Sequence, residues 1–181
     1  MHQRGFSLVE LLMGLTIAGI VLHLVSPAFA AVVEVNHREE AARSLANGMR
    51  SARSEAISRN QTVVIHGIDG DWGQGWRIIL DISGRGHEDA SNPLLIERRS
   101  GRSLAVFGNQ HITTSARFSP LGAPEHNGRQ AGTLFICAAR EQVSMHQVVL
   151  APSGRISLRS NKTAQELCAK GLKAPNERVA L

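Results

Sequence analysis

The N-terminal sequence MHQRGFSLVELLMGLTIAGIVL places one carboxylate, Glu10, at the start of a long apolar segment. A charged group is costly to bury in hydrocarbon, so a carboxylate in this position needs a partner of opposite charge. Cleavage between Gly5 and Phe6 would create one, because the new amine of Phe6 lies one helical turn from Glu10 in its own chain and is also available to a neighbouring chain. These residues therefore predict proteolytic processing followed by ion pairing.

The alternative interpretation of this segment is a secretory signal peptide. It has a basic start, an apolar middle and, at Ser26–Ala30 (SPAFA), an A-x-A-like cleavage site. Glu10 favours the earlier cleavage, because a secretory signal gains nothing from a carboxylate at the edge of its apolar region.

Leu11–Val33 contains no Asp, Glu, Lys or Arg, and His23 is its only titratable residue. As a helix this run would be roughly 30–35 Å long, which is enough to span a bilayer core. Arg4 precedes it and favours a cytoplasmic N-terminus. For His23 we expect a packing or tolerated polar role and not a proton relay.

The next segment predicts a continuation of this helix with one apolar face. Glu39 and Arg43 are spaced i,i+4 and add modest helix support, as are Glu55 and Arg59. The segment should pack against a domain, the alternative being a coiled-coil partner. The apolar stripe consists of Val35, Ala42, Leu45, Met49, Ala52 and Ala56.

After Asn60 the apolar pattern shifts to a period of two, which is typical of strands. Separators such as Asp69-Gly70, Asn92-Pro93 and Asn127-Gly128 have the composition of turns. Strands without intervening helices predict an antiparallel sheet with the amphipathic helix packed on it, an α+β fold. The expected strands are 61–66, 75–82, 94–98, 104–108, 116–119, 132–138, 146–151 and 154–159.

The sequence contains none of the common catalytic signatures. A Walker-type phosphate loop, a G-x-S-x-G elbow and an H-E-x-x-H helix are all missing, and the eight histidines are scattered. The loop Asp81–Asn92 has oxygen ligands of the kind that calcium takes, but it lacks EF-hand spacing and Arg85 would repel a cation, so a solvated hairpin loop is favoured. We therefore expect neither an enzyme nor a metal or other cofactor.

The stretch Arg4–Leu12 (RGFSLVELL) resembles the class III signal of type IV pilins and type II secretion pseudopilins. The resemblance implies that prepilin peptidase cuts after Gly5 and methylates Phe6, and that Glu10 contacts the N-terminus of a neighbouring subunit. Gly19 and Pro27 match the family's helix-weakening positions. The implied partners are other major or minor pilins or pseudopilins, the peptidase and the inner membrane.

Further along, ARSEAISRN, GWRIIL, GTLFIC and PSGRI resemble the FimT/GspH branch of minor pilins and pseudopilins. The resemblance implies a pilin-like fold and a single-pass inner-membrane protein, with its globular domain in the periplasm or within an extracellular pilus. It leaves open whether the machine is a type IV pilus or a type II secretion system. The implied parts are a leader (1–5), a membrane or filament-core helix half (6–33), an amphipathic helix half (34–60) and a β-rich domain with a basic tail (61–181).

Cys137 and Cys168 would be separate thiols in a reduced compartment and one disulfide outside it. The lack of a C-x-x-C motif argues against a redox pair. The resemblance places the domain outside the cytoplasm, and family members have cysteines in comparable places. It therefore implies a disulfide that ties the C-terminal tail to the sheet.

The net charge of +5 is accompanied by a basic tail after Gly154, and such a surface neutralises phosphates independently of base sequence. Aromatic residues make up only 4% of the chain, which argues against a base-stacking platform. The cations expected to contact DNA are Arg155, Arg159, Lys162, Lys170 and Lys173.

Several FimT-type minor pilins bind DNA during natural transformation through arginines of a C-terminal G-R-x-R-like motif, and this resemblance implies double-stranded DNA as a partner. Gly154 and Arg155 match that motif, whereas Ser157 replaces its second arginine. Arg159 lies two residues later, on the same face of a strand as Arg155. The alternative is that these cations solubilise an exposed edge or meet acidic patches on other pilins.

Overall fold

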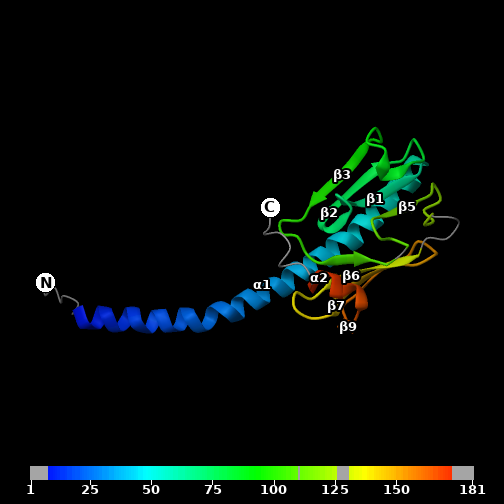
Figure 1. The fold of residues 1–181 in the computed structure, drawn as a ribbon. Coiled ribbons are helices and arrows are strands. Elements are labelled where there is room, and N and C mark those ends of the chain that lie inside the picture. Colours follow the sequence, from blue (N-terminus) through cyan, green and yellow to red (C-terminus); the bar gives the residue numbers. More distant parts are fainter. Residues whose placement is uncertain (1–7, 110, 126–130, 173–181) are drawn as a thin grey trace, which may run out of the picture. The chain divides into compact units, whose positions relative to one another are not determined.

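The computed structural model describes residues 8–109, 111–125 and 131–172, without the side chains of residues 24–28, 30 and 31. The chain divides into two compact units, Met1–His37 (unit 1) and Arg38–Leu181 (unit 2). Figure 1 shows its helices and strands.

Helix α1 (Leu8–Arg59) begins in unit 1, and Gly19 and Pro27 both lie within it. Its described apolar side chains in unit 1 are exposed, from Leu8 at 74% to Val33 at 36%. Across the residues that the structure describes, no helix combines the length and the apolar character needed to cross a membrane. The predicted leader, residues 1–5, lies outside the described residues.

Helix α1 ends in unit 2 at a left-handed residue. Asn60 has a φ of 51°, its N–H donates to the Ile57 carbonyl at 3.2 Å, and the Gln61 N–H donates to the Ala56 carbonyl at 3.2 Å. This pair of bonds is a Schellman motif, which satisfies carbonyls that the last turn leaves without helical partners. The motif explains why the helix ends at the boundary that the shift in periodicity predicts.

Unit 2 contains two antiparallel sheets, and all eight predicted strands are present in them. The first has the order β3-β2-β1-β5, and the second has the order β4-β6-β7-β8 with β9 paired to β7. A single sheet was expected, so the division into two is a difference, as is the short strand β9. The strands are β1 (Val63–Ile68), β2 (Asp71–Leu80), β3 (Leu94–Arg99), β4 (Val106–Gly108), β5 (Ser115–Phe118), β6 (Gly132–Cys137), β7 (Val143–Leu150), β8 (Ile156–Arg159) and β9 (Thr163–Ala164).

The hairpin between β1 and β2 is closed by Asp69 and Gly70, which have φ angles of 53° and 77°. Positive φ at both central residues is the requirement of a type I′ turn, and Asp-Gly is among its preferred sequences. The turn closes the Ile68–Asp71 pair, and the β1–β2 register shifts between Gly67 and Ile68, since Gly67 pairs with Trp76. Strand β1 is buried along its whole length.

The core of unit 2 lies between α1 and both sheets. In Figure 1 the strands β1–β3 and the strands β6–β7 lie alongside the cyan part of α1. The predicted stripe is buried, with Val35 of unit 1, 48% exposed, as the exception. Helix residues Ala42, Leu45, Met49, Ala52 and Ala56 pack in one cluster with apolar side chains that include Ile65, Phe118, Leu134 and Val148.

Trp76 of β2 connects α1 to the first sheet. Its ring lies against Gly48, where an added Cβ would come within 2.7 Å of ring atom Cε2. Its Nε1–H donates to Ser44 Oγ at 3.1 Å. Trp76 therefore has a packing role at the junction between helix and sheet.

Candidate functional site

The processing residues and the assembly carboxylate lie at the N-terminal end. Gly5 and Phe6 fall outside the described residues. Glu10 lies in the first turn of α1 and is exposed, between Val9 and Leu11, which are 62% and 59% exposed. The Glu10 carboxylate therefore lies among exposed apolar side chains of unit 1.

Cys137 and Cys168 form the predicted disulfide, with a Cα–Cα distance of 5.5 Å. Cys137 ends β6, and Cys168 ends the 3₁₀ helix η2 (Glu166–Cys168). Both are buried, and the Cys137 carbonyl accepts a hydrogen bond from Arg38 Nε at 2.9 Å. The bond fixes η2 and the short helix α2 (Ala169–Leu172) to the second sheet.

Arg155 and Arg159 line one surface groove together with Ser157, as expected for alternate residues of one strand face. Both arginines are exposed, and within the described part of the chain neither forms a salt bridge. Gly154 precedes them with a φ of 79°, a conformation that glycine adopts without steric cost. The groove presents two guanidinium groups whose geometry suits phosphate oxygens.

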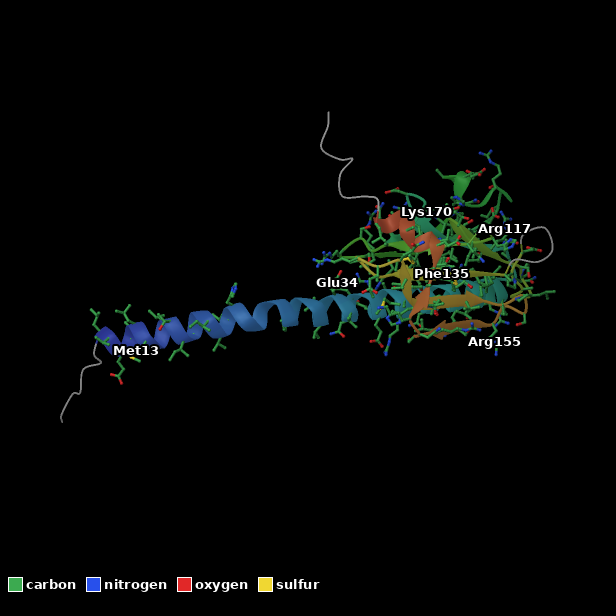
Figure 2. All side chains as sticks on the ribbon, turned by 60° about the horizontal axis from the view of Figure 1, so that its bottom comes forward. Met13, Glu34, Arg117, Phe135, Arg155 and Lys170 are labelled. Atoms are coloured by element: carbon green, nitrogen blue, oxygen red, sulfur yellow. A yellow bond between two sulfur atoms is a disulfide. The ribbon has the colours of Figure 1, made fainter. Side chains whose placement is uncertain are left out.

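The two described lysines of this set, Lys162 and Lys170, do not join these arginines. Lys162 Nζ is 2.6 Å from Glu141 Oε2 in a salt bridge. Lys170 lies in α2, next to a glycine that packs near Phe107 of β4, and β4 and β8 occupy opposite edges of their sheet. Figure 2 shows Arg155 and Lys170 on opposite sides of unit 2. Lys173 lies outside the described residues.

Sequence reasoning missed Arg50 and Arg53, which lie in α1 beside Arg155. The sequence signal that would have found them is the absence of an acidic residue at helical pairing distance. Arg43 and Arg59 each pair with a glutamate one helical turn earlier, whereas no acidic residue stands three or four positions from Arg50 or Arg53.

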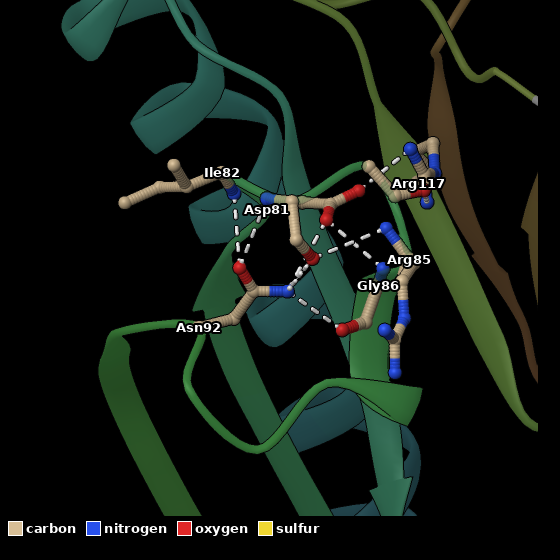
Figure 3. A network of polar contacts seen from close by, with 8 residues as sticks. Asp81, Ile82, Arg85, Gly86, Asn92 and Arg117 are labelled. Carbon is tan, nitrogen blue, oxygen red and sulfur yellow. Dashed lines mark hydrogen bonds and ion pairs between the residues drawn. The ribbon is translucent and has the colours of Figure 1, made fainter.

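The loop considered for calcium is held by polar contacts within the loop and by an ion pair with Arg117 of β5 (Figure 3). Asp81 Oδ2 is 2.6 Å from Arg117 Nη1, and Asp81 Oδ1 accepts from the Gly86 N–H at 2.9 Å. The Asn92 amide donates to the Gly86 carbonyl at 2.8 Å and accepts from the Ile82 N–H at 3.0 Å. Among the described residues no group of three or more His, Cys, Asp or Glu side chains is placed to hold a metal ion. The contacts therefore give this loop a structural role.

Two histidines in strands are structural as well. Burial lowers the pKa of His66, against the opposing effect of its bond to the Gly67 carbonyl, and its ring stacks on His87 with centroids 5.2 Å apart. Burial also lowers the pKa of His146 on β7, which is 3.1 Å from Ser160 Oγ through Nδ1. His66 is buried.

Comparisons with known proteins place this chain in a defined group. Residues 41–154, more than half of the chain, match the family described as type II transport protein GspH. Residues 1–26 match the prokaryotic N-terminal methylation motif. A search of curated protein sequences gave no match.

Two crystal structures of the type IV minor pilin FimU from Pseudomonas aeruginosa are similar to this chain. The P21 form has a TM-score of 0.58 at 22% identity, covering 75% of this chain and 98% of the FimU chain in that structure. The P65 form has a TM-score of 0.55 at 23% identity, covering 71% and 98%. At this identity the similarity establishes the α+β pilin fold.

Proposed function

The chain belongs to the family of the type II transport protein GspH, and we propose that it acts as a FimT-like minor pilin. It is a type IV pilin-like protein of the minor pilin and pseudopilin class. In this proposal prepilin peptidase cleaves after Gly5, Phe6 is methylated, and the mature chain enters a pilus or primes its assembly. The match of residues 1–26 to the methylation motif is the observation that carries the proposal.

Assembly would rest on two properties of unit 1. The uncharged run Leu11–Val33 would anchor the chain in the inner membrane by a single pass, with unit 2 in the periplasm. Glu10 would then pair with the Phe6 amine of a neighbouring subunit. This pairing sets the axial register, because an unpaired carboxylate in an apolar surrounding is strongly disfavoured. Gly19 and Pro27 would let the helix loosen between them inside a filament.

Intact mass and N-terminal sequencing of the protein from membranes test the processing step. The expected start is N-methyl-Phe6, and a start at Ala31 would refute the proposal in favour of a secreted domain. Glu10→Val should leave processing intact and abolish incorporation into filaments. Thr16→Val, which removes an exposed polar group from the same helix, is the control and should assemble normally.

We further propose that Arg155 and Arg159 bind the phosphates of duplex DNA during natural transformation. Their shared groove and their exposure support this, and so does the scarcity of aromatic side chains for stacking. Replacement of both by Gln should lower duplex affinity and its salt dependence. Replacement of Arg98 and Arg99 on β3 by Gln gives the same charge change and should have little effect. A wild-type chain that binds no duplex at low salt would end this proposal.

The second candidate is a minor pseudopilin of a type II secretion system. The description of the matched family as a type II transport protein favours it. Deletion of the gene separates the two, because loss of piliation or transformation supports the first candidate and loss of protein secretion supports the second.

A further inference from the structure

A second groove in unit 2 lies between α1 and the turn that leads into β8. The residues that carry the argument are Arg50, Arg53 and Ser54 from α1, with Ser153 and Arg155 from the turn. Arg50 and Arg53 are three positions apart and therefore lie on the same helix face. Three arginines from two segments far apart in the sequence thus line one depression.

The contacts of the two helix arginines hold them in place without neutralising them. Arg53 Nε donates to the Gly122 carbonyl at 2.9 Å. Arg50 donates from Nη2 to the Ile156 carbonyl at 3.4 Å and from Nη1 to Asn47 Oδ1 at 2.9 Å. A guanidinium has five N–H donors, so these contacts leave several on each arginine for a ligand.

The electrostatic setting of the groove favours an anion. None of the side chains that line it is acidic. The negative end of the α1 dipole acts only within the last turn, and Arg53 lies six residues before Arg59. The hydroxyls of Ser54 and Ser153 add neutral donors of the kind that phosphate oxygens accept.

Arg155 lines both this groove and the one that contains Arg159. The two grooves are therefore neighbours along one basic track from α1 across the turn to β8. Arg155 and Arg159 span about 13 Å on an extended strand, which is close to the rise of roughly four base pairs along the axis of a duplex.

We propose that the groove of Arg50, Arg53 and Arg155 is a phosphate-binding site that extends the contact of the protein with duplex DNA beyond β8. This inference rests on the DNA-binding part of the proposed function. Arginine engages phosphate oxygens through paired N–H groups, and each neutralised phosphate releases counterions. Four arginines on one track would give a slope of log affinity against log salt of about −3.6.

The experiment measures binding of a mixed-sequence DNA duplex by the full chain in a neutral detergent, from 50 to 200 mM salt. Arg50→Gln with Arg53→Gln should weaken binding about tenfold at the low end and make the slope shallower by about 1.8. The matched control is Arg43→Gln with Arg59→Gln, which removes the same charge from the same helix outside the groove. Arg50→Lys with Arg53→Lys should keep most of the affinity, and thermal unfolding checks that each variant is folded.

Each outcome separates this inference from the function on which it rests. Weakening in the groove variant, with the control within twofold of wild type, supports the site. Equal weakening in groove and control variants overturns it, because it would then reflect net charge alone. If replacing Arg155 and Arg159 lowers the affinity for duplex DNA and replacing Arg50 and Arg53 does not, DNA binding is supported and only the second groove is overturned. Absence of binding by the wild-type chain overturns both. Inorganic polyphosphate should displace the duplex if phosphates are the recognised groups, and failure to do so contradicts the inference.

Discussion

Replacing Gly48 with Ala should destabilise unit 2, although alanine is the better helix former. An ideal Cβ at this position would lie 2.7, 2.9 and 3.0 Å from three ring atoms of Trp76. Overpacking of this kind costs about 1–3 kcal/mol. The ring is 7% exposed and bonded to Ser44, so moving it also weakens a hydrogen bond worth about 0.5–1.5 kcal/mol. Helix propensity returns about 1 kcal/mol, which leaves a net loss of about 0.5–3.5 kcal/mol.

Urea unfolding followed by tryptophan fluorescence measures this change. Both tryptophans of the chain, Trp72 and Trp76, lie in unit 2, so the signal reports that unit. The matched control is Gly101→Ala, where an added Cβ meets nothing within 4 Å. Adding Trp76→Phe to Gly48→Ala should recover part of the loss, giving a non-additive double-mutant cycle. A Gly48→Ala chain as stable as wild type, or strictly additive energies, would refute the steric argument.

Three further predictions concern the sheet domain. Replacing Cys137 and Cys168 with Ser should lower the free energy of unfolding by roughly 3–4 kcal/mol, because the disulfide closes a loop of 31 residues. In a urea titration, the wild-type chain in reductant should unfold at the same urea concentration as the variant. Asp81→Asn should cost on the order of 3 kcal/mol, since it removes the buried carboxylate that pairs with Arg117, and added calcium should not change the thermal midpoint of wild type. Burial lowers the pKa of His66 below 6.5, so the unfolded chain binds the proton better than the folded chain. The free energy of unfolding should therefore fall as the pH drops below about 6.5. In His66→Gln the urea midpoint should depend less on pH between pH 8 and 5.

The strands could be predicted because their signals are local. Alternation of apolar residues and turn pairs such as Asp69-Gly70 place β1 and β2 from a few neighbouring residues. Strand β9 has no such signal. It consists of Thr163 and Ala164, both exposed, which pair with Ser144 and Val143 of β7. The disulfide at Cys168 anchors the chain just after β9.

The division into two sheets could not be predicted, because it depends on pairings between distant strands. Strand β5 joins β1 across about fifty residues, and β4 joins β6 instead of its sequence neighbour β5. Nothing in the alternation of either strand distinguishes these partners, because side-chain period fixes which face is buried and not which strand lies alongside.

The arginines of the candidate site were partly predictable. A period of two places Arg155 and Arg159 on one face, and the structure agrees. Counting cations along the tail groups Lys170 with them, whereas the disulfide at Cys168 anchors α2 near Phe107 of β4, at the opposite edge of the sheet. Cations that are close in the sequence need not be close in space, and only the fold decides which of them share a surface.

Only glycine fits at position 154, directly before Arg155, and the contact that requires it links the two grooves. Gly154 has a φ of 79°, and an added Cβ would lie 2.6 Å from the Gly122 carbonyl oxygen and 3.0 Å from Arg53 Nε. The same carbonyl oxygen accepts the hydrogen bond from Arg53 Nε. Any larger residue at position 154 would therefore push against the contact that positions the helix arginine, at the point where the chain turns into Arg155. The basic track is thus built on rigid elements, the end of a packed helix and the edge of a sheet, which hold charged groups at fixed spacing more accurately than a flexible tail.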